Sequence, residues 1–317
     1  MANYLSSPIP SEDLGNMIAV ANRYMHVGDN REAIRHWIEI ASLCGDRTPE
    51  TIYHRLGEAY ALNHESFGGT QEENRVWGDR DKHQILEDMH TQLEPEIYLE
   101  IGVDQGVSLS LARGRAIGVD ARPELKLTRP LGDNATLVAM SSDAFFRERA
   151  ETLLPVPPGL VFIDGMHLFE FALRDFMNVE RYSSPGSLVI IDDVCPCHPA
   201  QASRLPRTDS WTGDVWKLHP ILREARPELT LVGLNAKGTG LLLIAGLDRT
   251  NGVLWDNYEE IVRRYGSDID PPAEVLTRTG AITSESAILQ RLLSLLKVAR
   301  QEKWPLLQVR EALRLSV

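Results

Sequence analysis

The sequence predicts an α/β protein in which a mostly parallel sheet follows a small helical domain. Short apolar runs alternate with helical segments between residues 96 and 246, and before residue 64 the apolar residues recur at helical spacing. A glycine-rich turn also follows the first apolar run. Strands that alternate with helices form parallel sheets covered on both faces. We therefore predict a helical domain at residues 1–80, an α/β domain at 81–250 and a helical extension at 251–317.

The helical spacing comes first in LGNMIAVANRYMHVG, NREAIRHWIEIASLCG and PETIYHRLGEAYALNH, which predict three helices. Tyr24 and Tyr60 lie 36 residues apart (60 − 24), close to the tetratricopeptide period of ~34 residues. The domain is therefore either TPR-like, with one and a half repeats, or a plain helical hairpin. A stack this short must pack on the next domain or on another subunit.

A polar segment at residues 65–80, with Gly68 and Gly69, predicts a loop after the helical domain. DKHQILEDMHTQL then predicts an amphipathic helix, and a series of apolar runs predicts buried strands. These runs are EIYLEIGV, AIGVD, ATLVAM, LVFIDG, SLVIIDDV, LTLVGL and GLLLIAG. Only NAKGT separates the last two, so we expect them to form an antiparallel hairpin at the sheet edge.

The composition favours a small-molecule substrate. The net charge of −12 and the pI near 5.3 disfavour binding to nucleic acid. No apolar run approaches the ~20 residues that cross a membrane, and the first residues lack a basic segment followed by an apolar one. The three cysteines, Cys44, Cys195 and Cys197, do not suggest a disulfide framework, and Cys195, Cys197 and His198 lack paired zinc-site spacing. We predict a cytoplasmic protein without a membrane or nucleic-acid partner.

The segment YLEIGVDQGVSLSLA predicts a ligand-binding turn. Glu100 ends a strand, Gly102 and Gly106 flank the turn, and a helix is expected from Ser108. Glycines let a ligand approach the backbone, and a helix start offers free N–H groups. The spacing Glu-x-Gly-x-x-x-Gly resembles the first nucleotide-binding motif of Rossmann-like methyltransferases and departs from the Gly-x-Gly-x-x-Gly of dinucleotide enzymes. The alternative is a purely structural strand-to-helix turn.

Two aspartates follow the next strands. Asp120 closes the strand after the glycine turn, where an acidic side chain can accept hydrogen bonds from ribose hydroxyls. Asp143 follows the third strand and is expected either to contact the adenine amino group or to cap a helix. Both are predicted donor-binding residues.

A longer pattern points to a family. Ile-Asp-Gly-x-His, a helix with Asp175, Pro-Gly and an Ile-Asp-Asp strand end resemble macrocin-type O-methyltransferases and related cephalosporin-hydroxylase-like proteins over residues 96–246. The resemblance implies an S-adenosylmethionine-dependent O-methyltransferase with a divalent metal, Mg²⁺, beside the methyl donor. Carried over by position, it makes Asp164, Asp192 and Asp193 the metal ligands, with Asp164 also at the donor site. Carboxylates suit Mg²⁺, although aspartates at strand ends also cap helices or bond to loops.

His167 follows Asp164 by three residues and is the predicted catalytic base. Its ordinary pKa of ~6.5 suits removal of a proton from a hydroxyl, especially beside a metal. The alternative is a histidine that only bonds to its loop. Trp211 and Trp216 either pack or line the acceptor pocket, with core packing expected for Trp216.

The leading hypothesis is methyl transfer to a hydroxyl of a sugar, glycoside or other small secondary metabolite. The alternatives are a metal-independent methyltransferase and a degenerate binding or scaffold protein that uses its helical repeats. The intact glycine turn and Asp120 favour an enzyme. The helical ends, with apolar stripes that lack a partner in the sequence, predict a homo-oligomer. The likeness in fold does not identify the acceptor.

Overall fold

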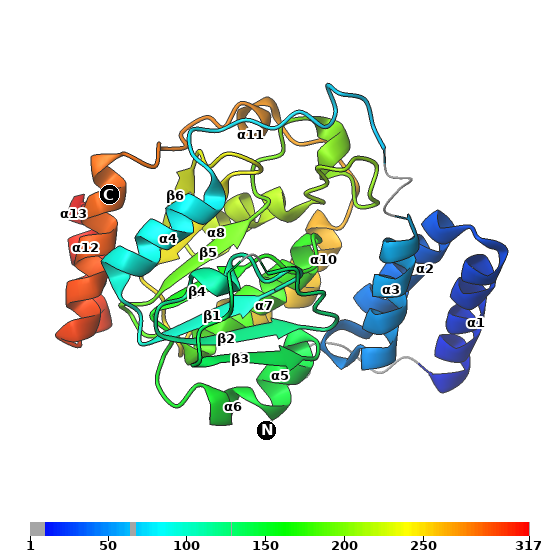
Figure 1. Cartoon of the computed structure of the whole chain (residues 1–317), viewed down its shortest axis with the longest axis horizontal. Coiled ribbons are helices and arrows are strands. Elements are labelled where there is room, and N and C mark those ends of the chain that lie inside the picture. Colours follow the sequence, from blue (N-terminus) through cyan, green and yellow to red (C-terminus); the bar gives the residue numbers. More distant parts are fainter. Residues whose placement is uncertain (1–9, 64–67, 128, 317) are drawn as a thin grey trace.

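A seven-stranded sheet forms the centre of the molecule (Figure 1). The computed structural model describes residues 10–63, 68–127 and 129–316. The strand order is β3-β2-β1-β4-β5-β7-β6. The strands are β1 Ile97–Ile101, β2 Arg115–Asp120, β3 Ala135–Ala139, β4 Leu160–Ile163, β5 Leu188–Asp192, β6 Thr230–Leu234 and β7 Leu241–Ala245.

The pairing confirms the predicted sheet. The first five strands pair parallel with one another, and β7 pairs antiparallel with both β5 and β6. The short connection between β6 and β7 makes them a hairpin, with β6 at the edge. Because the parallel strands point the same way, β1, β2, β4 and β5 end at one side of the sheet, which we call the carboxyl edge.

Two apolar cores cover the two faces of the sheet. One contains side chains of α5 Ser142–Glu148, α6 Ala150–Leu153, α7 Phe169–Tyr182, α8 Leu218–Ala225, α9 Val253–Asp256 and α10 Tyr258–Tyr265. The other contains side chains of α4 Lys82–Leu93, α12 Ala287–Gln301 and α13 Leu306–Ser316. The remaining short helix, α11 Ala273–Leu276, lies between α10 and α12 in the chain. The fold is thus the predicted Rossmann-like arrangement.

The helical N-terminal part contains the three predicted helices, α1 Ser11–Val27, α2 Asn30–Cys44 and α3 Glu50–Asn63. Its buried residues, such as Trp37 and Leu56, share one core with Leu168 and Phe171 at the start of α7. The short stack therefore packs on the next domain of the same chain, one of the two arrangements we expected. The boundaries at residues 80 and 250 stay predictions.

The predicted loop at residues 65–80 lies partly outside the described residues, which resume at Gly68. From there the chain crosses the carboxyl edge (Figure 1), where Trp77 bridges to Gly238 and Asp81 bridges to Lys237. It enters α4 at Lys82. The crossing segment thus delivers the first residue of α4 to the carboxyl edge.

The apolar stripe of the C-terminal helices has its partner in the same chain. Leu292, Leu296 and Leu313 are buried in the core that also contains Met89 and Leu93 of α4. The expectation that this stripe lacks a partner is therefore wrong, because α4 and the sheet cover it. The homo-oligomer is still a prediction, but this stripe is no longer a reason for it. No helix among the described residues has the length and apolar character needed to span a membrane.

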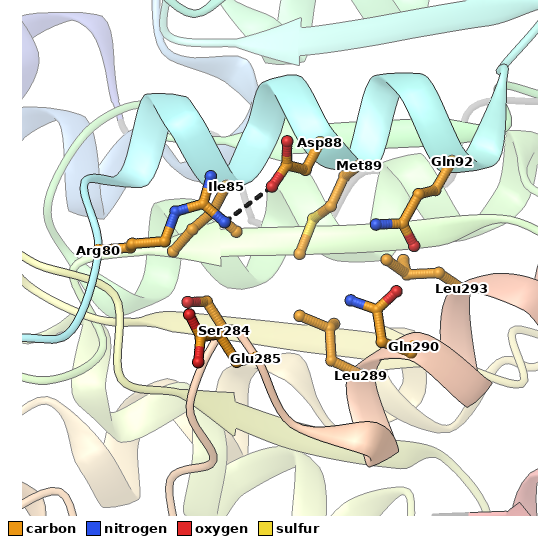
Figure 2. A pocket seen from close by; sticks show the side chains of 10 residues that line it. All are labelled: Arg80, Ile85, Asp88, Met89, Gln92, Ser284, Glu285, Leu289, Gln290 and Leu293. Atoms are coloured by element: carbon orange, nitrogen blue, oxygen red, sulfur yellow. Dashed lines mark hydrogen bonds and ion pairs between the residues drawn. The ribbon is translucent and has the colours of Figure 1, made fainter.

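A groove of about 300 Å³ lies between α4 and α12 (Figure 2). Met89 and Leu289 form part of its apolar floor. On its rim, Arg80 Nη1 pairs with Asp88 Oδ2 at 2.8 Å. None of the predicted site residues lines it, so the groove does not coincide with the chemistry at the carboxyl edge.

Candidate active site

The glycine turn after β1 lies directly against the end of β4. A Cβ atom at position 102 would lie 2.0 Å from the carbonyl oxygen of Asp164, and Gly102 has a φ of +84°. Only glycine fits such a close approach with left-handed backbone. The predicted donor turn and the predicted metal ligand Asp164 therefore meet at one place on the carboxyl edge.

The helix expected from Ser108 is a single 3₁₀ turn, Leu109–Leu111. It cannot extend further because residues 112–114 must return the chain to β2 at Arg115. The Ser108 hydroxyl donates to Glu100 Oε1 at 2.7 Å. Ser108 therefore supports the turn from within, and its contact with a donor stays a prediction.

Glu100 is fully buried beneath the turn. It accepts hydrogen bonds from the Tyr98 hydroxyl at 2.6 Å and from Ser108. Burial raises the pKa of Glu100 to about 8, although these hydrogen bonds oppose the shift. At neutral pH the side chain is mostly an uncharged acid that joins β1 to the glycine turn.

This raised pKa predicts a pH dependence of stability. The unfolded chain releases the Glu100 proton near its ordinary pKa of ~4.3, whereas the folded chain keeps it up to about pH 8. Between these pH values the folded state binds more protons, so the free energy of unfolding falls as pH rises. We expect Glu100→Gln to remove a decline on the order of 2–4 kcal/mol between pH 5 and pH 8. Urea unfolding at several pH values measures it.

Glu96→Gln is the matched control, because Glu96 lies just before the same strand and is exposed. It should keep the pH dependence of the unchanged chain. An identical pH dependence in the Glu100→Gln variant would contradict the buried, protonated state of Glu100.

Asp120 ends β2 beside the glycine turn, as predicted. Its Oδ2 accepts the backbone N–H groups of Val103 at 2.8 Å and Asp104 at 2.9 Å, and its Oδ1 accepts that of Arg122 at 2.6 Å. The carboxylate is partly exposed and fixes the shape of the turn. Its contact with ribose hydroxyls stays a prediction.

Asp143 bonds to residues outside the predicted site. It is buried between α3 and α7, where its Oδ2 accepts from Arg174 Nη2 at 2.9 Å and from the Tyr53 hydroxyl at 3.1 Å. Ser141, and not Asp143, caps α5 through its hydroxyl. Both carboxylate oxygens bond to Arg174, so the geometry gives Asp143 a structural contact, and its contact with adenine stays untested.

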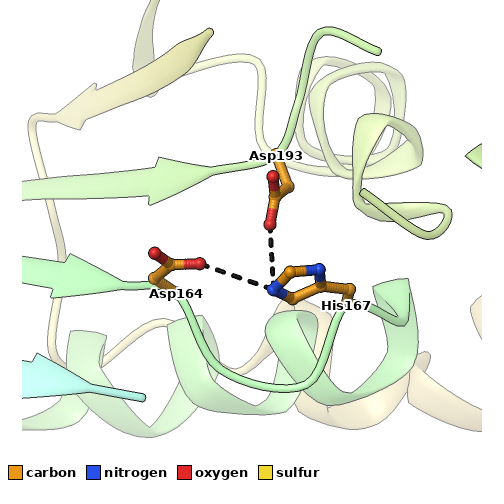
Figure 3. Close-up of side chains that lie close together, drawn as sticks. All are labelled: Asp164, His167 and Asp193. Atoms are coloured by element: carbon orange, nitrogen blue, oxygen red, sulfur yellow. Dashed lines mark ion pairs between the residues drawn. The ribbon is translucent and has the colours of Figure 1, made fainter. Parts of the chain in front are cut away.

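Asp164, His167 and Asp193 form a compact group (Figure 3). One possible ligand atom from each lies within 4.8 Å of the others. His167 Nε2 lies 3.0 Å from Asp193 Oδ2 and 3.5 Å from Asp164 Oδ1. Its Nδ1 lies 3.0 Å from the carbonyl oxygen of Trp211, which can only accept, so Nδ1 carries a proton. In the neutral ring, Nε2 then has the free lone pair that a metal needs.

Asp192 points to a different partner. Its carboxylate bonds to Lys82 Nζ and accepts from the Thr239 hydroxyl at 3.0 Å. Lys82 Nζ also lies 3.1 Å from Asp164 Oδ2. The structure thus groups His167, and not Asp192, with the other two predicted metal ligands, while the ligand role of Asp192 remains untested.

Lys82 was not predicted as a site residue, and Trp211 was predicted only to pack or to line the acceptor pocket. Lys82 begins α4, where the helix dipole disfavours a cation, so a lysine there indicates a carboxylate partner. Trp211 stacks on His167, with ring centroids 5.1 Å apart. No spacing signal points to this contact, because the residues lie in separate loops. Trp216 is buried, as predicted.

The electrostatics of the group follow from three carboxylates beside two cations. Burial disfavours the charged form of His167, but Asp193 and Asp164 outweigh it and raise the pKa of His167 to about 9. Burial raises the pKa of Asp193 to about 7, although His167 opposes this. For Asp164, Lys82 and His167 outweigh burial and lower the pKa. At neutral pH His167 is therefore protonated on both ring nitrogens, and it can act as a base only after Nε2 has lost its proton.

Comparison with known proteins identifies the class. Residues 99–194 match the model of a family described as a methyltransferase domain. This segment runs from β1 to just after β5 and contains every predicted donor, metal and base residue. The match confirms the predicted Rossmann-like methyltransferase domain, and with it the class of S-adenosylmethionine-dependent methyltransferases.

Several solved structures resemble the chain at low identity. A candidate O-methyltransferase from Klebsiella pneumoniae is 18% identical over 58% of this chain and 86% of its own, with a TM-score of 0.42. The O-methyltransferase from Bacillus cereus in complex with SAH is 14% identical over 67% and 99%, with a TM-score of 0.40. MycE methyltransferase of the mycinamycin pathway, in complex with Mg and SAH, is 18% identical over 53% and 49%, with a TM-score of 0.36. No curated protein matches the sequence.

Proposed function

We propose that the chain transfers a methyl group from S-adenosylmethionine to a hydroxyl of a sugar, glycoside or other small secondary metabolite, with the help of a divalent metal. The observation that carries this proposal is the group of Asp164, His167 and Asp193 directly beside the glycine turn. A donor in the turn and an acceptor oxygen at this group would lie next to each other at the carboxyl edge.

The donor set fits a divalent cation. Two carboxylates and an imidazole suit Mg²⁺ or Mn²⁺, and the Trp211 carbonyl holds His167 in the tautomer that leaves Nε2 available. Asp193 has a left-handed backbone with a φ of 63°, which is uncommon outside glycine and aims its side chain at His167. A bound divalent cation supplies a Lewis acid that lowers the pKa of a coordinated hydroxyl.

The residues of this chain would then orient the reaction. Asp164, His167 and Asp193 hold one side of the site, and the glycine turn allows the donor to approach it. Holding the two reactants in this geometry supplies much of the rate enhancement for a displacement at a methyl group. His167 acts in this proposal as a ligand, and the role of base predicted from the sequence is the alternative.

A second candidate is a metal-independent methyltransferase. Lys82 bridges Asp164 and Asp192, and a protonated His167 faces Asp193, so the chain can neutralise most of its own carboxylate charge. In that arrangement no divalent cation is needed for a stable site. The two candidates differ in whether a metal binds, which can be measured directly.

Calorimetry with S-adenosylhomocysteine, with and without Mg²⁺, tests the proposal. We expect donor binding in both conditions, because the glycine turn and Asp120 keep their shape without a metal, and we expect a separate heat of metal binding. Asp120→Ala should weaken donor binding by one to two orders of magnitude, on the order of 1.5–3 kcal/mol, because it removes the predicted ribose contacts and the bonds that shape the turn.

The exposed Asp133 is the matched control for Asp120, and Asp133→Ala should bind as the unchanged chain does. Donor binding without metal binding would favour the metal-independent candidate. The absence of donor binding would favour the scaffold alternative. Unchanged affinity for S-adenosylhomocysteine in Asp120→Ala would contradict the assignment of Asp120 to the donor site.

A further inference from the structure

An aromatic stack joins the N-terminal helices to His167. Tyr60 lies near the end of α3, and its ring centroid is 5.7 Å from that of Trp211. Trp211 in turn stacks on His167, with the ring planes 26° apart. The three rings come from a helix, from the loop before α8 and from the turn after β4. One side of the imidazole therefore has an aromatic wall that the helical N-terminal part supports.

Trp211 also holds His167 through the backbone. Its carbonyl oxygen accepts from His167 Nδ1 at 3.0 Å. Two residues later, a Cβ atom at position 213 would lie 1.6 Å from the carbonyl oxygen of His167, and Gly213 has a φ of +54°. The loop and the turn are packed so closely that a displacement of Trp211 must displace His167.

The same loop has a second connection to the helical part. Arg204, on the same loop, bonds to Glu170 at the start of α7 and to Asp214, which follows Gly213 at the end of the loop. Ser42 of α2 donates to Glu170 Oε1 at 2.9 Å. Trp211 Nε1 donates to the carbonyl oxygen of Ser203 at 2.6 Å. The loop is thus anchored at both ends, and Tyr60 packs on its tip.

We propose that Tyr60 and Trp211 are positioning residues for His167, and that the N-terminal helices are therefore a working part of the methyl-transfer site. The proposal rests on the proposed function in that His167 is taken as a metal ligand. A ligating imidazole must keep both its tautomer and its ring plane, and contacts that fix them contribute 10–100-fold to metal affinity. Trp211 supplies both contacts, and Tyr60 holds Trp211.

The test compares Tyr60→Leu, which removes the ring but keeps an apolar side chain, with Tyr60→Phe, which keeps the ring. The full chain is titrated with Mn²⁺ in a calorimeter. We expect Tyr60→Leu to bind Mn²⁺ about tenfold more weakly and Tyr60→Phe to bind as the unchanged chain does. The ¹⁵N shifts of the His167 ring, measured without metal, should change in Tyr60→Leu alone of the two.

Tyr24→Leu is the control for loosening of the helical part, because Tyr24 also stacks on a histidine, His36, at 5.1 Å. It should leave the His167 signals and Mn²⁺ affinity unchanged. Trp211→Leu removes the same contact from the loop side and keeps the backbone carbonyl, so it replaces Tyr60→Leu if that variant does not fold. Affinity for S-adenosylhomocysteine should stay unchanged in all of them.

Unchanged Mn²⁺ affinity and unchanged His167 signals in Tyr60→Leu and Trp211→Leu would overturn the proposal. If the unchanged chain binds no Mn²⁺, the metal-assisted function fails, and the His167 signals alone decide the role of Tyr60 and Trp211. Altered signals in Tyr60→Leu, with normal signals in Tyr24→Leu, then support it. The same signals in all variants then refute it.

Discussion

Replacing Asp193 by alanine is expected to weaken Mn²⁺ binding by on the order of 100-fold or more, because it removes one of the three proposed ligands and two ligands would be too few to hold the ion. Excess EDTA should likewise abolish methyl transfer to an accepted hydroxyl substrate. Binding of S-adenosylhomocysteine should survive both treatments. Calorimetry measures the two affinities, and transfer of a labelled methyl group measures turnover.

Asp133→Ala serves again as the control, since it removes an exposed carboxylate outside the site. His167→Ala separates the two roles of the histidine. A loss of Mn²⁺ affinity would identify His167 as a ligand, whereas intact Mn²⁺ binding with a rate lowered by roughly 10²–10⁴ would identify it as the base. Full turnover in excess EDTA would remove the metal from the mechanism.

Replacing Arg174 by methionine is expected to lower the free energy of unfolding by about 3–5 kcal/mol. Arg174 is buried and bonds to both oxygens of Asp143 and to the Tyr258 hydroxyl, so its loss leaves a buried carboxylate without its cation. Urea unfolding measures the effect.

The double variant Arg174→Met with Asp143→Asn should regain part of the stability, because it removes both charges of the pair. Asp143→Asn alone also tests the predicted adenine contact. If the side chain is structural, the variant is less stable but binds S-adenosylhomocysteine normally. A tenfold loss of that affinity at unchanged stability would instead support the adenine contact.

The strands were predictable because their apolar runs are short and separated, and most of them end at or just before glycine or aspartate. Glu100, Asp120, Asp164 and Asp192 each lie at a strand end, and parallel strands bring such residues to one edge. The predicted order of strands was therefore enough to bring most of the candidate site residues to one edge of the sheet.

Partners from loops and helices were not predictable in the same way. Which carboxylate faces His167 depends on side-chain direction at the end of β5, where Asp192 bonds to Lys82 and Asp193 turns to the histidine. Trp211 reaches His167 through a loop whose path depends on Gly213 and Arg204. The burial of Asp143 depends on how α3 packs on α7. These features arise from tertiary packing that local sequence patterns do not encode.

The cover that α12 and α13 place over α4 has a consequence for folding during synthesis. The apolar face of α4, with Ile85 and Met89, leaves the ribosome long before Leu292 and Leu296 are made. Until residues 287–316 emerge, this face and the sheet beneath it lack their cover, and exposed apolar surface of this kind promotes aggregation. A chain truncated before α12 should therefore depend on chaperones, even though it retains residues 99–194, which match the methyltransferase domain.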